Sequence, residues 1–165
     1  MLNKSTKKQL STGIAVLVMA AAILMNSSAE TNYAAQHSPA TNHCSAETIN
    51  VVLTEWTISP DKTTVSAGPV TFKVINSGSA DVNEMAVVKT DLAAASLPVD
   101  ANGNMDEKAK GIRIIGEIED IAVGASTHAA FDLEPGNYVL ICNIWDSGEQ
   151  ESHYAEGMFI AFKVR

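Results

Sequence analysis

Two segments with alternating apolar residues, separated by a polar loop, set the strongest limit on what this chain can fold into. Residues 138–142 and 158–164 both place apolar side chains at every second position. That period of two is typical of β-strands, whose successive side chains point to opposite faces of a sheet. We therefore predict two neighbouring strands, with residues 143–157 forming the loop that joins them and brings its ends together.

The same region carries three side chains that are soft metal ligands. Cys142 ends the first segment, His153 lies on the loop, and Met158 begins the second segment. Ten residues separate the cysteine from the histidine, and four separate the histidine from the methionine. Thiolate and thioether sulfur stabilise Cu(I), whereas imidazole binds both oxidation states, so this set favours copper in electron transfer. Zinc is the weaker interpretation because its structural sites rarely use methionine.

The composition indicates a globular protein with one domain and an appendage. The 165 residues are 46% hydrophobic and only 18% charged, which is enough apolar material for a full core. The formal charge of −8, with an isoelectric point near 4.8, argues against nucleic acid or an anionic membrane surface as the partner.

Residues 1–29 have the pattern of a secretory signal peptide. Three lysines give the segment a positive start, and an uncharged apolar run follows at 13–25. Small residues at the end of the segment predict cleavage after Ala29, which leaves 8 basic and 19 acidic residues. We expect a periplasmic or secreted protein. A membrane tether is expected only if the leader stays uncleaved, since the apolar run is shorter than the ~20 residues that span a bilayer.

Residues 30–47 are small and polar without apolar periodicity, which predicts a flexible linker before a domain at 48–165. The linker contains His37, His43 and Cys44. The adjacent His43 and Cys44 cannot easily face one ion, so a second metal site is a minor interpretation. A disulfide between Cys44 and Cys142 is a further alternative in an oxidising compartment, and it would take Cys142 away from a metal.

The domain consists of short extended segments separated by turns. Alternating or apolar runs predict strands at 49–58, 63–65, 70–75, 85–88, 112–114, 117–121, 127–133, 138–142 and 158–164. Residues 91–97 have the one helix-friendly composition, and residues 98–110 indicate an acidic, mobile excursion. Because the strands do not alternate with helices, we predict an all-β fold, an antiparallel Greek-key β-sandwich.

Three stretches of the domain resemble the cupredoxins, the blue-copper β-sandwich family. They are the strand and turn at 72–78, the run at 133–143, and the loop end at 153–158. The resemblance covers about 48–165 and implies a cupredoxin-like sandwich that binds one copper ion and carries single electrons. It also implies that the chain is not an enzyme, and that it meets a redox partner protein or a copper donor or acceptor.

In the family pattern, one histidine ligand precedes the cysteine, histidine and methionine of the loop. The resemblance therefore implies Cys142, His153 and Met158 as ligands, and it puts Asn83 where the first histidine usually stands. An amide oxygen is a harder donor than an imidazole nitrogen. Three outcomes stay open: Asn83 or a water completes the site, Glu84 supplies an oxygen, or the site is degenerate and holds no metal.

For other residues near the predicted site, we favour a structural role over a role in metal binding. We expect surface exposure, core packing or loop packing for His128, Tyr138, Trp145 and Tyr154. Asn143 is expected to hydrogen-bond across to the strand of Asn83. We expect three carboxylates of the loop either to be solvated or to steer a basic partner protein. They belong to Asp146, Glu149 and Glu151.

Two other classes of function remain. A copper carrier or scavenger would use the same ligands without fast redox cycling. A metal-free β-sandwich binding module would keep the fold and lose the ion. A strong visible charge-transfer absorption separates the electron carrier from colourless Cu(I) binding and from a chain that binds no copper.

Overall fold

The computed structural model describes residues 46–165. The expected leader at 1–29 and nearly all of the expected linker at 30–47 lie outside the described residues, so both assignments stay predictions. The first strand begins at Glu47, next to the expected start of the domain.

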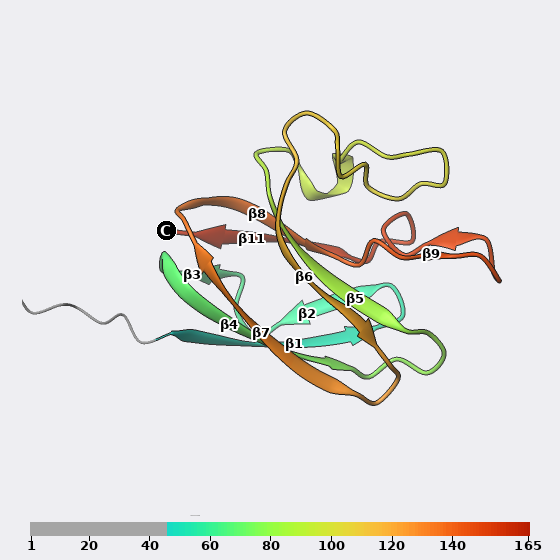
Figure 1. Ribbon diagram of the computed structural model, residues 1–165, viewed down its shortest axis with the longest axis horizontal. Coiled ribbons are helices and arrows are strands. Elements are labelled where there is room, and N and C mark those ends of the chain that lie inside the picture. Colours follow the sequence, from blue (N-terminus) through green and yellow to red (C-terminus); the bar gives the residue numbers. More distant parts are fainter. Residues whose placement is uncertain (1–45) are drawn as a thin grey trace, which may run out of the picture. The chain divides into compact units, whose positions relative to one another are not determined.

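Eleven strands and one short 3₁₀ turn make up the described fold (Figure 1). In chain order they are β1 Glu47–Thr54, β2 Thr57–Pro60, β3 Thr64–Val65, β4 Gly68–Asn76, β5 Asn83–Lys89, η1 Ala94–Ser96, β6 Arg113–Ile121, β7 Ser126–Leu133, β8 Gly136–Ile141, β9 Trp145–Asp146, β10 Glu151–Ser152 and β11 Phe159–Val164. The segment with helix-friendly composition at 91–97 thus forms only the turn η1.

The strands form a sandwich of two main sheets, which confirms the all-β prediction (Figure 1). One sheet has the order β2-β1-β4-β7 and the other the order β3-β11-β8-β5-β6, while β9 and β10 pair in a small hairpin. Both main sheets contribute to one core, in which Phe72 contacts Phe131 and Phe162. The residues of β4 alternate between this core and the outer face, so the period of two in the sequence reflects one-sided burial.

Two strand pairings are parallel, although the sequence led us to expect antiparallel neighbours. β1 runs parallel to β4, with Ile49 opposite Phe72, and β11 runs parallel to β3, with Val164 opposite Val65. The chain crosses to the second sheet for β3 and returns for β4, which then runs in the same direction as β1. Alternation identifies a strand but not its neighbour, so the sequence pattern could not reveal these pairings.

The strand β8, which leads into the loop at 143–157, is buried on both faces. Tyr138 and Leu140 point into the main core, as their shared face predicted. Val139 and Ile141 point the other way, into a second and smaller apolar cluster. A strand that is packed on both sides has little freedom to shift, so the position of the residue that follows it is well defined.

The segment between β5 and β6 covers this second cluster, and the prediction of a mobile excursion at 98–110 is wrong for its middle part. Met105 is only 2% exposed. Its N–H donates to Asn143 Oδ1 at 2.7 Å, and Asn104 Nδ2 donates to Asn143 O at 2.8 Å. The acidic composition gave no sign of Met105, the buried residue that fixes this segment to the start of the loop at 143–157.

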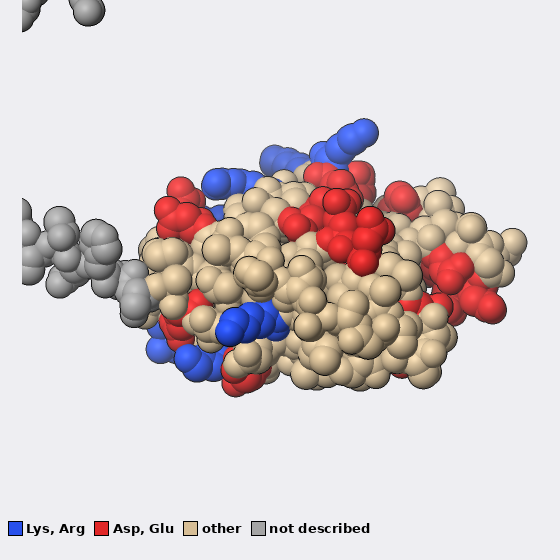
Figure 2. Space-filling view, turned by 60° about the horizontal axis from the view of Figure 1, so that its bottom comes forward, with Lys and Arg blue, Asp and Glu red and all other residues tan. Residues whose placement is uncertain are grey.

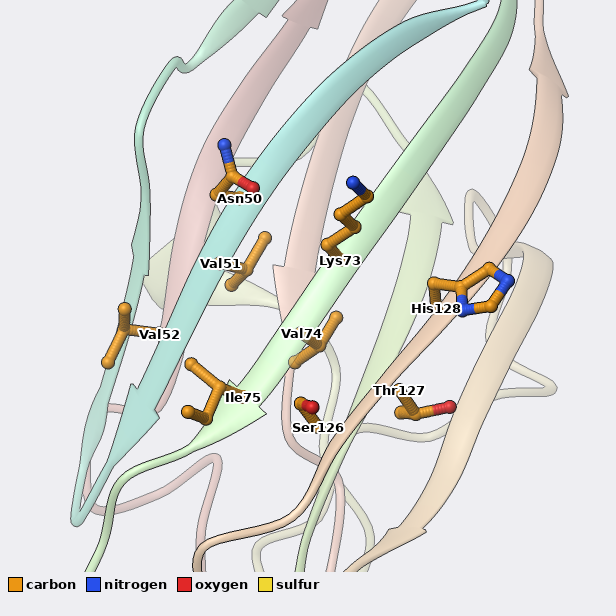
Figure 3. A pocket seen from close by; sticks show the side chains of 9 residues that line it. All are labelled: Asn50, Val51, Val52, Lys73, Val74, Ile75, Ser126, Thr127 and His128. Atoms are coloured by element: carbon orange, nitrogen blue, oxygen red, sulfur yellow. The ribbon is translucent and has the colours of Figure 1, made fainter.

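The outer face of the four-stranded sheet holds a groove of about 330 Å³ (Figure 3). Lys73 of β4 and His128 of β7 stand opposite each other along it. The side chain of His128 is exposed, as its surface interpretation predicted. Among residues 46–165, no helix is long and apolar enough to cross a membrane.

Candidate metal centre

Cys142 follows the last residue of β8 and lies at the start of the loop at 143–157. Its N–H donates to Met158 O at 3.0 Å, and the N–H of Met158 donates to His153 O at 2.9 Å. The antiparallel pairing of β8 with β11 therefore brings the two ends of the loop together, as the alternating segments predicted. Residues that are eleven and sixteen positions apart in the sequence become neighbours.

Three donor atoms meet at this end of the sandwich. His153 Nδ1 lies 3.1 Å from Asn83 Oδ1 and 3.3 Å from Cys142 Sγ. The remaining pair, Cys142 Sγ and Asn83 Oδ1, lies 3.6 Å apart. All three residues are buried, with at most 2% of their surface exposed, and Met158 is fully buried in the same apolar cluster as Cys142. The structure thus brings three of the four expected residues to donor distance and packs the fourth beside them.

Asn76, the last residue of β4, determines which end of the Asn83 amide faces the centre. Asn83 Nδ2 donates to Asn76 Oδ1 at 3.1 Å, which leaves Asn83 Oδ1 toward the other two donor atoms. Asn76 is itself fully buried, and its Nδ2 donates to the carbonyls of Asp81 and Ile121, both at 2.8 Å. The sequence marked Asn76 only as the start of a turn, because these contacts join the end of β4 to the segment that leads into β5 and to the end of β6.

The Cys142 sulfur also accepts a hydrogen bond from the backbone of β5. Glu84 N–H donates to Cys142 Sγ at 3.4 Å, and Asn143 N–H donates to Glu84 Oε1 at 3.0 Å. These two bonds join β5 to the start of the loop, which confirms the cross-strand role expected of Asn143. Burial raises the pKa of the Glu84 carboxyl, and the bond from Asn143 opposes that rise.

Burial controls the protonation of the two titratable donors. It raises the pKa of the Cys142 thiol to about 12 and lowers the pKa of His153. Without a cation, the thiol and the imidazole are therefore both neutral at pH 7. A metal ion that takes the thiolate would replace the thiol proton, so metal binding here would release a proton.

The donor set fits a soft or borderline ion. Atoms that share one ion at about 2.0 to 2.3 Å lie roughly 3.3 to 3.8 Å apart, close to the spacing of the three donors. Asn83 Oδ1 and His153 Nδ1 are close enough that a proton or a cation must lie between them to offset the repulsion of their lone pairs. Residues 46–165 contain no group of three His, Cys, Asp or Glu side chains that could hold a metal. A copper site would therefore also need the Asn83 amide, the Met158 thioether or a water.

Trp56 lies against the ring of His153. The two rings are T-shaped, with 5.2 Å between their centroids and an interplanar angle of 82°. Trp56 is the second residue of the two-residue turn between β1 and β2, and its φ of 61° is a conformation that bulky residues rarely adopt. His153 Nε2 is buried and has no hydrogen-bond partner among the described residues. Nothing in the sequence linked this turn to a loop almost a hundred residues away.

The remaining residues that we singled out have structural roles. Tyr138 OH donates to Glu134 O at 2.8 Å, and Tyr154 OH donates to a backbone carbonyl of η1 at 2.8 Å. Both tyrosines therefore serve packing, as expected. Cys142 is a free cysteine among residues 46–165. Its alternative disulfide partner Cys44 and the linker histidines lie outside the described residues.

An acidic cavity of about 610 Å³ opens beside His153. Five carboxylates line it, from Asp81, Glu84, Glu119, Asp120 and Asp146. No Lys or Arg lines it, and none of the three ion pairs within the described part of the chain involves these carboxylates. Figure 2 shows acidic side chains, without basic ones in that view, toward the right-hand end of the domain, where β9 lies in Figure 1. The surface beside the candidate centre is therefore negative.

Comparisons with known proteins identify the fold. No protein-family model and no curated sequence matches this chain. Among solved structures, dithionite-reduced auracyanin from Roseiflexus castenholzii is 24% identical, with a TM-score of 0.51 over 73% of this chain and 98% of that one.

Auracyanin A from Chloroflexus aurantiacus, a blue copper protein, is 26% identical, with a TM-score of 0.46 over 72% of this chain and 98% of that one. Rusticyanin from Thiobacillus ferrooxidans is 17% identical, with a TM-score of 0.49 over 73% and 79%. The first of these matches carries the assignment: the described chain has the same fold as auracyanin, a two-sheet sandwich of the cupredoxin type, as the resemblance in sequence implied.

Proposed function

We propose that this chain, whose fold is that of the cupredoxins, binds one copper ion and carries single electrons outside the cytoplasm. The proposed ligands are Asn83, Cys142, His153 and Met158. Export by the leader to the periplasm or the medium is part of the proposal. The proposal includes no enzymatic activity, as the resemblance to the cupredoxins implied.

One observation carries this proposal. A thiol sulfur, an imidazole nitrogen and an amide oxygen lie within 3.1 to 3.6 Å of one another in a buried position. Without a cation these three atoms are one another's hydrogen-bond partners, and all three converge on the same point. Such convergence, with a fully buried thioether from Met158 alongside, is what a small soft cation requires.

The chain's own residues would support electron transfer by holding the site still. Bound copper would supply a one-electron couple between Cu(I) and Cu(II). Cys142 is held by backbone bonds to Met158 and from Glu84, and Asn83 is held by Asn76. Because these contacts come from packed strands, the donors have little room to rearrange between oxidation states. Burial of the donors also excludes bulk water from the site.

We propose that the redox partner presents a positively charged surface. The acidic cavity lies beside His153, so a basic partner that docks there would approach the candidate centre. Opposite charges on the two surfaces would raise the rate of encounter and orient the partner.

A second candidate function, a copper carrier without fast redox cycling, has one observation in its favour. An amide oxygen from Asn83 stands where an imidazole nitrogen would complete a blue-copper plane, and the site thereby loses a nitrogen donor that serves Cu(II) well. A carrier of this kind would take up and release Cu(I) in exchange with a copper donor or acceptor.

The test is a copper titration of the full chain beside two cysteine variants. Wild-type protein, Cys142→Ser and Cys44→Ala are titrated with Cu(II) and with Cu(I) while the visible spectrum is recorded. One equivalent of Cu(II) with an intense thiolate charge-transfer band supports the electron carrier. One equivalent of colourless Cu(I), without a stable Cu(II) form, supports the copper carrier.

The variants decide whether the site is the one described. Cys142→Ser should lose stoichiometric copper, because the thiolate is the strongest donor. Cys44→Ala should keep the wild-type copper content and unfolding midpoint. Full copper occupancy in Cys142→Ser would overturn both candidates, and wild-type protein without copper would favour the metal-free binding module.

A further inference from the structure

We propose that Trp56 is a positioning residue for His153: it stabilises the imidazole tautomer that carries its proton on Nε2 and leaves Nδ1 free to bind a metal. This inference rests on the proposed copper site, but it concerns the chain's own residues. It assigns a role to a side chain in a turn that contributes no donor atom of its own.

The geometry of the donors determines which tautomer the site needs. His153 Nδ1 faces Asn83 Oδ1 and Cys142 Sγ. Without a metal, a proton on Nδ1 can donate to the amide oxygen. To offer the Nδ1 lone pair to an ion, a neutral imidazole must carry its single proton on Nε2. The group that meets the other ring nitrogen therefore influences how readily the site accepts a metal.

No oxygen or nitrogen atom of the described residues accepts a hydrogen bond from Nε2. His153 is only 1% exposed, and its Nε2 is buried without a partner. The group against the ring is the indole of Trp56, which is almost perpendicular to the imidazole at 82°. In a T-shaped pair, the edge of one ring meets the face of the other, and an N–H on that edge interacts favourably with the π electrons. An indole face over Nε2–H would favour the metal-binding tautomer.

The backbone of Trp56 supports a role beyond packing. Position 56 has a φ of 61°, where Gly or Asn is the usual residue of a hairpin turn. A bulky residue in that conformation is strained, and such strain is typical of functional positions. The residue before it, Glu55, accepts hydrogen bonds from the N–H groups of Ser79 and Ala80. These bonds tie the turn to the segment that leads into Asn83, so the indole is held beside the site.

The test separates an effect on the tautomer from an effect on folding. Full-length wild type, Trp56→Gly, Trp56→Phe and the control Trp145→Ala are labelled with ¹⁵N in histidine. The tautomer ratio of His153 is read from the ¹⁵N–¹H couplings of its ring in the metal-free protein. Cu(I) affinity is measured by competition with a chelator, and the unfolding midpoint is recorded for each protein.

In Trp56→Gly, we expect the ratio of Nε2–H to Nδ1–H to fall by about two- to fivefold, the range that a weak N–H···π contact supports. Cu(I) affinity should fall by a similar factor. Glycine suits the φ of this turn, so the unfolding midpoint should stay the same or rise. Trp56→Phe should restore most of the ratio, because it keeps an aromatic face. Trp145→Ala, which removes the other indole of the described residues, should match wild type.

An unchanged tautomer ratio in Trp56→Gly would overturn the proposal and leave Trp56 as a packing residue. An equal fall of the ratio in Trp145→Ala would also overturn it, since the effect would then not be specific to the ring that contacts His153. If wild-type protein takes up no copper, the proposed function fails, whereas the metal-free tautomer ratio still decides the role of Trp56.

Discussion

At the scale of single residues, the two ends of the Asn83 amide have different roles: one is hydrogen-bonded to the end of β4, and the other faces the candidate centre. Its Nδ2 donates to Asn76, and its Oδ1 lies 3.1 Å from His153 Nδ1. An imidazole in this position could keep the bond to Asn76 through one N–H and offer the other nitrogen to a metal. Position 83 is therefore where one substitution can change the chemistry of the site without a change in fold.

We predict that Asn83→His creates or strengthens a blue Cu(II) thiolate spectrum. The added imidazole would complete two nitrogens and one thiolate around the ion, the arrangement that blue-copper sites use. Visible and electron paramagnetic resonance spectra of the copper-loaded variant check this. Asn83→Ala is the control and should show no such gain. If Asn83→His binds copper as the parent does in both spectra, Asn83 does not occupy a ligand position.

We predict that Asn76→Ala destabilises the fold by about 3 kcal/mol or more, because it leaves several buried polar groups unpaired. The carbonyls of Asp81 and Ile121 would lose their donor, and Asn83 Nδ2 would lose its acceptor. Urea unfolding measures the change. Asn50→Ala is the matched control, since its side-chain bond to Asp61 is exposed, and it should cost less than about 1 kcal/mol. Equal losses in the two variants would contradict the prediction.

Residue types with distinctive chemistry were identifiable from the sequence, whereas the residues that support them were not. Cys142, His153 and Met158 stood out because sulfur and imidazole donors are rare and lay on one loop. Asn76 and Trp56 act through contacts with distant segments, and neither asparagine nor tryptophan in a turn signals a metal site. The local sequence pattern indicates which side chains could bind a metal, but it does not indicate the direction in which a buried amide points.

At the scale of whole elements, β6 and β7 approach each other where the two main sheets meet. Gly116 of β6 faces Phe131 of β7, and a Cβ atom at position 116 would overlap the phenyl ring. The absence of a side chain at this position lets Phe131 reach Phe72 in the core, with 6.2 Å between ring centroids. The contact between these two strands therefore depends on a pair of residues of opposite size.

We predict that Gly116→Ala destabilises the protein by about 1 to 3 kcal/mol through overpacking against Phe131. The double variant Gly116→Ala/Phe131→Leu should recover part of this loss, because the smaller side chain gives way to the added methyl group. A double-mutant cycle from urea unfolding measures the coupling energy. Purely additive effects of the two substitutions would contradict the predicted contact.

Strand positions were predictable to within a few residues because one-sided burial produces alternation. The sequence indicated β4, β7, β8 and β11 in this way. The prediction of one strand at 49–58 was wrong, because the chain turns at Glu55 and Trp56 and forms the hairpin of β1 and β2. The parallel partners of β1 and β11 were not predictable, since pairing depends on where the chain crosses between sheets. Met105 was missed because a single apolar residue within an acidic segment has no periodicity.

At the scale of the whole molecule, charge is distributed unevenly. The ion pairs of the described residues join Lys62 to Glu47, and Lys89 and Arg113 to Glu134. The carboxylates of the cavity beside His153 have no such partners. Because like charges repel unless they are screened, this face keeps a negative potential that reaches about one Debye length, roughly 8 to 10 Å, into physiological buffer.

We predict that electron transfer from the copper-loaded chain to a basic c-type cytochrome slows as ionic strength rises. Steering of this kind raises association rates by roughly 10- to 1000-fold, so loss of one carboxylate in Asp81→Asn should lower the rate at low salt by about two- to threefold. Stopped-flow absorbance measures the rate. Asp132→Asn, on β7, removes the same charge from outside the cavity and should have a smaller effect. An equal effect of both variants would mean that net charge, and not the cavity, governs the encounter.

The hydrogen-bonded base of the loop at 143–157 has a consequence for protein engineering. Cys142 and Met158 are joined by the bond from Cys142 N–H to Met158 O, at the end of the ladder between β8 and β11. This bond closes the base of the loop. We therefore expect that the loop length can change without a shift of Cys142 or Met158. A shorter loop with a differently spaced histidine could be grafted between these two residues. Loop length and metal binding could then be varied while the β-sandwich stays the same.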